Sequence, residues 1–513
     1  MNALVRREPF VDFPVIGSDA PDALRLGRFA DTHRNLITGR IGYGGERNAL
    51  IFGPNGSGKG TRLLVPNLLQ TYDQSIFVLD PKGELAAITA PCRRKVSDVV
   101  VINPFGLFVD RPGYADLQSV GFNPLMQLNP RSPSFNREAA QLAEALITVS
   151  DKDPHWDVSA RALVSAIIMY VVMEAHDMLS PEVRAMAGVG EPMHKGVPTM
   201  ARVRELIALR SERPSAANDH RGVGIPALAL AMMQTGHAGL RNKASQFASW
   251  SEEIQSIASV AREQTVPFDD DEIAADLAKP GFRMASMKER PVTVYLLLHP
   301  DHMERHAKWL RLVVAAALQA VMRPREPGEP KMLFMLDEFA ALGHMEIIET
   351  VWALVRGYGI QILPIFQDLN QLKNLYKERW QTFIAQAGAI MSLAPNDLTT
   401  ARWISERAGD TTRVIQSQSS STSSSTSGGS SRSGRNSGWS ENSSLSSSSQ
   451  PTKVPFVQPH SLFGMHPGAT LSFIAGLSDI VPGYAPPYWH IEHCMRRARE
   501  NPYHPTSEKP TTT

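Results

Sequence analysis

The chain is poor in cysteine and carries almost no net charge. Only two cysteines, Cys92 and Cys494, occur in 513 residues. This excludes a disulfide framework and a cysteine-rich zinc site, and it indicates a reducing compartment. Lys and Arg number 52 against 51 Asp and Glu. The overall balance therefore gives no signature of a polyanion-binding protein, although a balanced chain can still carry a local basic surface.

The chain also lacks a long hydrophobic run. Its start, MNALVRREPFVDFPVIG, has no apolar core of the kind that a signal peptide needs. The longest uncharged apolar stretch is Ala162–Met173, which is shorter than the ~20 residues of a membrane-spanning helix. We therefore expect a cytoplasmic protein, at most peripheral at the inner face of the cell membrane, that contacts a membrane only through a partner.

Eight strand-like segments recur along the chain, and helical patterns separate them. Most are continuously apolar, which is typical of strands covered on both faces in a parallel sheet. They predict an α/β fold with a mostly parallel, doubly wound sheet. The segments are residues 48–52, 75–80, 98–103, 291–298, 331–337, 360–366, 389–394 and 469–476.

One long interval, residues 131–285, contains helical patterns and no convincing strand. It predicts an all-α domain inserted into the α/β domain. The predicted division is an N-terminal segment 1–47, a first part of the α/β domain 48–130, the all-α domain 131–285, a second part of the α/β domain 286–415, a Ser-rich segment 416–450, a last part of the α/β domain 451–495 and a flexible tail 496–513.

The Ser-rich segment stands apart in composition. Ser supplies 19 of the 35 residues from Gln416 to Gln450. Such a segment buries too little apolar surface to offset its ordering entropy, so it is predicted to be a disordered excursion.

A glycine-rich loop, GPNGSGKGT, follows the first of these strands and precedes a helical pattern. Its glycines let backbone N–H groups approach phosphate oxygens, and its lysine can reach the terminal phosphates. It predicts binding of ATP with Mg²⁺, although Gly60 stands where a metal-binding Ser or Thr is usual. Thr61 either ligates the metal or is an ordinary first-turn residue, in which case the metal depends on other oxygens. The candidate cofactor-binding residues are Gly53, Pro54, Asn55, Gly56, Ser57, Gly58, Lys59, Gly60 and Thr61.

Polar residues at the ends of other apolar strands complete a candidate site. Asp337 and Glu338 follow KMLFML, and they predict a ligand of the Mg²⁺ shell and a general base, respectively. Gln367 follows IQILPIF and is either a sensor of the γ-phosphate or a solvated strand end. Arg356 is either a finger that reaches a neighbouring subunit's nucleotide or a cation stabilised at a helix C-terminus. The motif LDPKGEL adds polar residues at a further strand end, to which spacing alone assigns no role.

Seven motifs in a fixed order resemble the TraG-type coupling proteins of type IV secretion and conjugation. They are GPNGSGKGTRLLVPNLL, IFVLDPKGEL, VINPFG, DPHWDVSARALVSAIIMYV, FMLDEFAALGHM, RGYGIQILPIFQDLNQLKNLY and PFVQPHSLFGM, and they span roughly residues 26–490. The resemblance implies a RecA-like P-loop motor domain with an inserted all-α domain, assembled as a homo-hexamer around DNA. It assigns Lys59 to the phosphate loop, Asp337 and Glu338 to the acidic pair, Gln367 to the sensor and Arg356 to the arginine finger. The partners it implies are single-stranded DNA with its relaxase and the components of the secretion apparatus.

The resemblance has two departures. Family members usually begin with transmembrane helices, whereas this chain starts near the motor domain, and the Ser-rich segment is the second departure. The first departure leaves three explanations open: a separate membrane partner, a free cytosolic motor, or a degenerate element. Two functions remain open: an ATPase that translocates DNA, and a nucleotide-binding adaptor that recruits protein cargo with little hydrolysis. A phosphotransferase acting on a small molecule fits less well, because the helical insertion suits a macromolecule.

Overall fold

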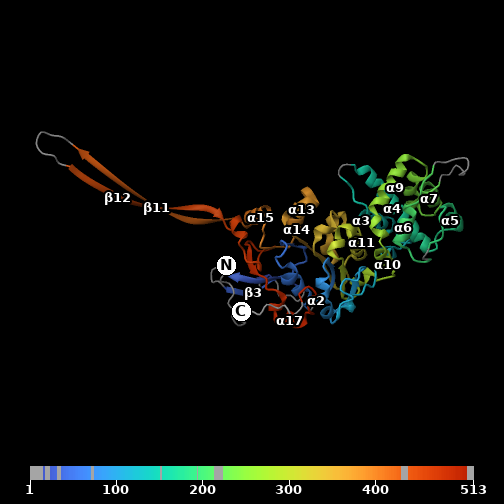
Figure 1. Cartoon of the computed structure of the whole chain (residues 1–513), viewed down its shortest axis with the longest axis horizontal. Helices are drawn as coiled ribbons and strands as arrows, with labels where there is room; N and C mark the ends of the chain where they lie inside the picture. Colours follow the sequence, from blue (N-terminus) through green and yellow to red (C-terminus); the bar gives the residue numbers. More distant parts are fainter. Residues whose placement is uncertain are drawn as a thin grey trace. The chain divides into compact units, whose positions relative to one another are not determined.

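The computed structural model describes residues 16–17, 23–31, 36–70, 74–150, 153–192, 195–212, 223–428 and 437–504. The chain divides into two compact units. One comprises residues 1–394 with 466–513, and the other comprises residues 395–465. Figure 1 labels some of the helices and strands of each unit.

The first unit is built on one mixed sheet, in the order β1-β3-β2-β14-β13-β10-β4-β9-β8-β5-β7-β6. The seven strands from β10 to β6 pair in parallel. They are β4 (Ala49–Phe52), β5 (Gln74–Asp80), β6 (Asp98–Ile102), β7 (Val292–Leu297), β8 (Lys331–Leu336), β9 (Ile360–Phe366) and β10 (Ala389–Leu393). These seven and β13 (Ala469–Ile474) confirm all eight predicted strands.

A second set of strands extends the sheet beyond β10 with antiparallel pairings. β13, β14 (Val481–Tyr484), β2 (Leu24–Asp31) and β3 (Leu36–Tyr43) follow one another, and β1 (Ile16–Gly17) pairs in parallel with β3. The predicted N-terminal segment and the last part of the α/β domain, residues 451–495, thus contribute strands to the same sheet. The sequence did not reveal β2 and β3, because Gly and Arg interrupt their apolar pattern.

Helices of the first unit cover the faces of this sheet, as the predicted α/β fold requires. They are α1 (Val65–Leu68), α2 (Glu84–Arg93), α11 (Met303–Val321), α12 (Glu346–Tyr358), α13 (Leu369–Tyr376), α14 (Trp380–Gln386) and α17 (Glu492–Arg497). The buried core combines side chains of the parallel strands with those of α1 and α2. The predicted fold class is therefore confirmed.

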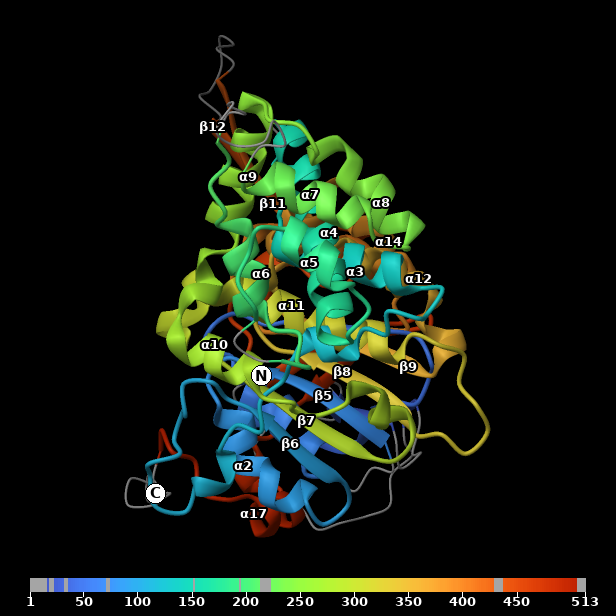
Figure 2. The same cartoon turned by 90° about the vertical axis from the view of Figure 1, so that its right-hand side faces the viewer.

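The described part of residues 131–285 is helical, as predicted, and contains no named strand. Its α-helices are α3 (Phe135–Leu146), α4 (Pro154–Ala175), α5 (Pro181–Met186), α6 (Met200–Ile207), α7 (Ile225–Met233), α8 (Ala238–Ala244), α9 (Glu252–Gln264) and α10 (Asp271–Ala278). Side-chain caps fix the starts of several, with Thr199, Ser251 and Asp270 each accepting backbone N–H groups of the first turn. Figure 2 shows these helices gathered together beside the sheet.

The central helix of this domain, α4, is the one helix among the described residues that is long and apolar enough to cross a membrane. The most apolar part of α4 is 72% buried within the protein. Neighbouring helices α3, α6, α8 and α9 pack against it. Its apolar surface therefore forms the core of the helical domain.

The second unit contains α15 (Leu398–Ala408), α16 (Pro459–Leu462) and a long antiparallel hairpin of β11 (Asp410–Gly428) and β12 (Ser437–Pro455). The hairpin differs from the predicted lack of regular structure in the Ser-rich segment. Its register runs from Asp410 opposite Pro455 to Gly428 opposite Ser437. Because a ladder is held by backbone hydrogen bonds, a composition poor in apolar side chains does not prevent it. Residues 429–436 lie outside the described part.

The end of the chain also departs from the predicted flexible tail. Tyr114 donates its hydroxyl hydrogen to the carbonyl of Glu500. The backbone N–H of Arg499 donates to the carbonyl of Ile88. Residues 499–504 therefore form a strap fixed against α2 and the segment that follows β6, whereas residues 505–513 lie outside the described part.

Candidate nucleotide site

The phosphate loop connects β4 to a π-helical turn, Gly60–Leu64, that continues into α1. Gly56 and Gly58 have φ angles of 78° and 80°, in the left-handed region that favours glycine. The backbone N–H of Gly53 donates to the carbonyl of Phe366 at 2.9 Å, which ties the start of the loop to the end of β9. Glycine at positions 56 and 58 therefore permits the backbone conformation of this loop.

Lys59 reaches back across this loop. Its Nζ donates to the carbonyl of Gly53 at 2.7 Å, and the side chain is only 8% exposed. Burial lowers the pKa of Lys59, while the nearby carboxylates of Glu338 and Asp337 oppose that shift. The ammonium group therefore lies between the loop and the acidic strand end.

The loop offers polar groups that suit a phosphate. Ser57 is 5% exposed, and its Oγ has no hydrogen-bond partner among the described residues. No side chain caps the helical turn that begins at Gly60. Uncapped N–H groups at a helix start and an orphaned hydroxyl are the donors that phosphate oxygens need. The residues present therefore fit a nucleotide with its Mg²⁺.

The acidic pair directly follows β8, the second strand over from β4. The backbone N–H of Asp337 donates to the carbonyl of Leu79 at 3.3 Å, so the strand ends β8 and β5 stay together. Burial raises the pKa of Asp337 to about 6, with the neighbouring Glu338 adding to the shift and Lys59 opposing it. Glu338 has φ 48° and ψ 43°, a left-handed conformation that is uncommon for a residue with a side chain.

Gln367 contacts the acidic pair directly. Its Nε2 donates to Oε2 of Glu338 at 3.1 Å, and its backbone N–H donates to Oε1 of Gln371 at 2.9 Å. The prediction of a polar amide beside the acidic site matches this contact. Lys59, Asp337, Glu338 and Gln367 thus meet at the carboxyl edge of the sheet, where open α/β sheets bind ligands.

The motif at the end of β5 lies at the same edge. Asp80 is 1% exposed, and its Oδ2 accepts the backbone N–H of Ala86 at 2.8 Å. Burial raises the pKa of Asp80 to about 7, and the charges of Asp337 and Glu84 add to the shift. Lys82 is exposed, and Glu84 begins α2.

Two of the predicted site residues take other positions. Thr61 turns back to its own loop, where its Oγ1 donates to the carbonyl of Gly58 at 3.3 Å. Arg356 lies near the amino end of β9, whereas Gln367 follows the carboxyl end. Because β9 has seven residues, the two lie roughly 20 Å apart along the strand direction. The structure therefore does not bring Arg356 to this chain's own phosphate loop.

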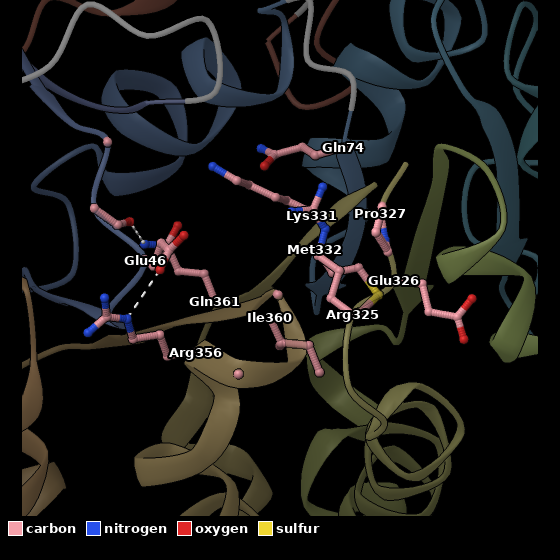
Figure 3. Close-up of a pocket in the computed structure, with 14 residues that line it drawn as sticks. Glu46, Gln74, Arg325, Glu326, Pro327, Lys331, Met332, Arg356, Ile360 and Gln361 are labelled. Atoms are coloured by element: carbon pink, nitrogen blue, oxygen red, sulfur yellow. Dashed lines mark hydrogen bonds and ion pairs between the residues drawn. The ribbon is translucent and has the colours of Figure 1, made fainter. Parts of the chain in front are cut away.

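Arg356 lines a cavity of about 340 Å³ at the amino edge of the sheet, shown in Figure 3. Its side chain is 71% exposed, and its Nε pairs with Oε2 of Glu46 at 3.1 Å. Gln361 donates to the carbonyls of Gly45 and Arg47 in the same region. Lys331 and Arg325 also line the cavity, together with the carboxylates of Glu46 and Glu326.

The strap contributes contacts that the sequence did not reveal. Asn501 is 3% exposed, and its Nδ2 donates to Oε1 of Glu84 at 2.6 Å. Tyr503 donates its hydroxyl hydrogen to the carbonyl of Lys82 at 2.9 Å. More than 400 residues separate Asn501 from Glu84 along the chain, so no local pattern signals the contact. Within the described ranges, no group of three or more His, Cys, Asp or Glu side chains forms a metal cluster by itself.

The fold and the site together define a RecA-like P-loop NTPase with an inserted helical domain. The family model described as "Type IV secretory system Conjugative DNA transfer" matches residues 27–476, and the chain belongs to this family. The conjugal transfer protein TraG of Escherichia coli is 27% identical over 82% of this chain and 63% of its own length. Protein VirD4 of Agrobacterium fabrum is 25% identical over 74% of this chain and 52% of its own length. The chain thus spans less than two thirds of the length of these relatives.

Solved structures of a plasmid coupling protein, TrwB, share the fold. The complex of TrwB with the GTP analogue GDPNP matches with a TM-score of 0.57 and 14% identity, over 86% of each chain. The complex with ADP and Mg²⁺ matches with a TM-score of 0.55 and 15% identity, again over 86% of each chain. At this identity the likeness establishes the fold alone.

Proposed function

We propose that this chain is an ATP-driven coupling protein that recruits DNA, as a relaxase-bound strand, and moves it to a type IV secretion or conjugation apparatus. Family membership supports the assignment to DNA transfer. The observation that carries the proposal is the meeting of Lys59, Asp337, Glu338 and Gln367 at one edge of the sheet. A phosphate loop, an acidic strand end and a polar amide are the parts that a nucleotide-hydrolysing motor needs.

The site residues take distinct roles in this proposal. Lys59 exchanges its bond to the Gly53 carbonyl for the terminal phosphates, and Asp337 belongs to the Mg²⁺ shell. Mg²⁺ held there would neutralise charge on the phosphate oxygens. Glu338 takes a proton from the attacking water, and Gln367 orients that water and reports on the γ-phosphate through its hydrogen bond to Glu338.

The proposed assembly is a homo-hexameric ring in which Arg356 acts on a neighbour's nucleotide. Two observations support this role. Arg356 lies at the amino edge, far from its own phosphate loop, and its guanidinium is 71% exposed. Its ion pair with Glu46 is exposed on both sides and therefore weak. A neighbour's triphosphate can thus displace Glu46.

A buried arginine offers a route from the nucleotide to the helical domain. Arg311 of α11 is 5% exposed, and its Nε donates to the carbonyl of Ala145 in α3 at 3.0 Å. Its Nη1 donates to the carbonyls of Leu342 and His344, which follow the acidic pair. We propose that changes at Glu338 reach the helical domain through this residue, and that the helical domain faces the DNA or protein cargo.

The motor works at the cytoplasmic side of the membrane in this proposal. A strand-displacement assay tests translocation. The chain is expected to strip a third strand from triplex DNA with ATP and not with a non-hydrolysable analogue. No displacement, with turnover intact, would contradict a translocating motor.

An assembly adaptor is the second candidate, and Gly60 is the observation that favours it. Without the usual hydroxyl, the loop offers one metal ligand fewer. An adaptor would bind ATP and recruit protein cargo but show little turnover. The presence of both Glu338 and Gln367 in contact favours the motor.

A further inference from the structure

We propose that Glu84 supplies the magnesium-facing oxygen that Gly60 lacks, and that Asn501 of the C-terminal strap holds Glu84 in place. The inference rests on the proposed nucleotide function. It assigns a role to the LDPKGEL motif, which the spacing of the sequence left without one. It also answers how a loop with Gly after its lysine can hold Mg²⁺.

The space beside Gly60 carries the argument. Where the Cβ of a Ser or Thr at position 60 would lie, the nearest heavy atom is Oε2 of Glu84, at 3.8 Å, leaving aside Lys59, Thr61 and the backbone of the same helix. No other such atom comes within 4 Å. The volume that a hydroxyl would fill is therefore open, and a carboxylate oxygen borders it.

The strap determines which oxygen of Glu84 faces this space. Oε1 accepts the hydrogen bond of 2.6 Å from the buried Asn501. The Oδ1 of Asn501 in turn accepts the backbone N–H of Tyr503 at 2.9 Å. Arg499 donates to the carbonyl of Ala87 at 2.6 Å, which fixes the strap to α2. Within the described part of the chain, Oε2 of Glu84 has no hydrogen-bond partner, so it is available to a ligand.

The chemistry of the surroundings fits a divalent cation. Mg²⁺ prefers oxygen ligands and binds through one or two carboxylates together with phosphates and water. Asp80 and Asp337 follow the paired residues Leu79 and Leu336 on neighbouring strands. Glu84 and Glu338 add two more carboxylates at this edge, against the single buried ammonium of Lys59. The orphaned Oγ of Ser57 independently marks the loop as a site for a ligand.

The same geometry argues against Thr61 as the replacement. Its Oγ1 is engaged with the carbonyl of Gly58, within its own loop. Glu84, in contrast, is a carboxylate whose Oε2 has no hydrogen-bond partner in the described part of the chain and whose Oε1 is held by the buried Asn501.

Binding of a fluorescent non-hydrolysable ATP analogue to the full chain tests the inference, with Mg²⁺ and with EDTA. Glu84→Gln keeps an oxygen that can accept from Asn501, so its fold should persist. We expect it to lower the Mg²⁺-dependent gain in affinity by about tenfold or more, with affinity in EDTA unchanged. Glu84→Asp, which keeps the charge but shortens the reach, is expected to lower the gain as well and carries the test if Glu84→Gln does not fold.

A rescue and a matched control complete the design. Adding Gly60→Ser to Glu84→Gln should restore most of the gain, because the open space accepts the hydroxyl. Glu492→Gln removes an exposed carboxylate paired with Arg496 and should leave the gain unchanged. Retention of the gain in Glu84→Gln, an equal loss of affinity in EDTA, or failure of the rescue would each overturn the role of Glu84. If the unmodified chain bound no nucleotide, that result would contradict the proposed function itself.

Discussion

Gln367 and Glu338 are joined by a hydrogen bond of 3.1 Å between Nε2 and Oε2. The bond links the ends of two neighbouring strands, β9 and β8, at the carboxyl edge of the sheet. Glu338 is held there in a left-handed backbone conformation. The general base and the sensor of the proposed site therefore form one unit.

Replacing Glu338 by Gln separates binding from hydrolysis. The amide keeps the size of the side chain and a partner for Gln367 but cannot take a proton. We expect ATP affinity close to that of the unmodified chain and a turnover lowered by about 10²- to 10⁴-fold. Equilibrium binding and steady-state phosphate release measure the two quantities, and normal turnover would remove Glu338 as the base.

Replacing Lys59 by Ala should abolish nucleotide binding. The side chain is the only cation of the phosphate loop itself, and its Nζ lies against the loop carbonyl of Gly53. Lys95→Ala, at an exposed position two residues after the end of α2, is the matched control and should bind normally. Unchanged ATP binding by Lys59→Ala would place the nucleotide elsewhere.

Replacing Arg356 by Ala should lower turnover only when subunits are assembled. Its distance from its own loop leaves it no role in an isolated subunit. An arginine finger can contribute about 10³- to 10⁵-fold to the rate. Arg379→Ala, which removes an exposed arginine paired with Glu349, is the control. Turnover followed against protein concentration checks the prediction, and an equal loss in a dilute, monomeric sample would refute action on a neighbour.

Replacing Asp80 by Asn should stabilise the metal-free protein at neutral pH. Burial raises the pKa of this carboxyl from 3.8 to about 7, so the folded state binds its proton more tightly than the unfolded state does. Its contribution to stability is therefore greatest below pH 4 and declines as the pH rises to 7. We expect Asp80→Asn to raise the free energy of unfolding by roughly 2–4 kcal/mol at pH 8 and to change it little at pH 4.

Denaturant unfolding in EDTA at several pH values measures this difference. The Asn side chain can still accept the N–H of Ala86, so the helix start is kept. Asp98→Asn, at an exposed ion pair with Arg290, should show no such pH dependence. If Asp80→Asn changed the free energy of unfolding equally at pH 4 and pH 8, the result would contradict a buried Asp80 carboxyl with a raised pKa.

Deleting residues 419–447 should leave the stability of the remaining protein nearly unchanged. The deleted residues belong to the hairpin β11–β12, whose described strands pair only with each other. A two-stranded hairpin is at best marginally stable by itself. The free energy of unfolding is expected to shift by less than about 0.5 kcal/mol. A loss of several kcal/mol would mean that the hairpin is part of the folding core.

The sequence predicted the parallel strands well, and the reason is physical. Strands buried on both faces are continuously apolar, so they stand out, and the residue after each strand lies at a known edge of the sheet. Lys59, Asp337 and Gln367 could therefore be brought together from spacing alone. Strands β2 and β3 lack that apolar signal.

The sequence did not predict the contacts between residues far apart along the chain. Nothing local shows that Asn501 anchors Glu84, because the contact joins opposite ends of the chain. The hairpin was missed for another reason. Composition reports the apolar surface that a segment can bury, whereas the ladder from Asp410 to Pro455 is defined by backbone pairing.

The most direct test of the central claim is steady-state ATP hydrolysis by the purified chain with and without single- and double-stranded DNA, with Lys59→Ala as the blank. The account predicts turnover that DNA stimulates strongly and that the variant lacks. Tight ATP binding without turnover, indifferent to DNA, would contradict the motor and favour the assembly adaptor.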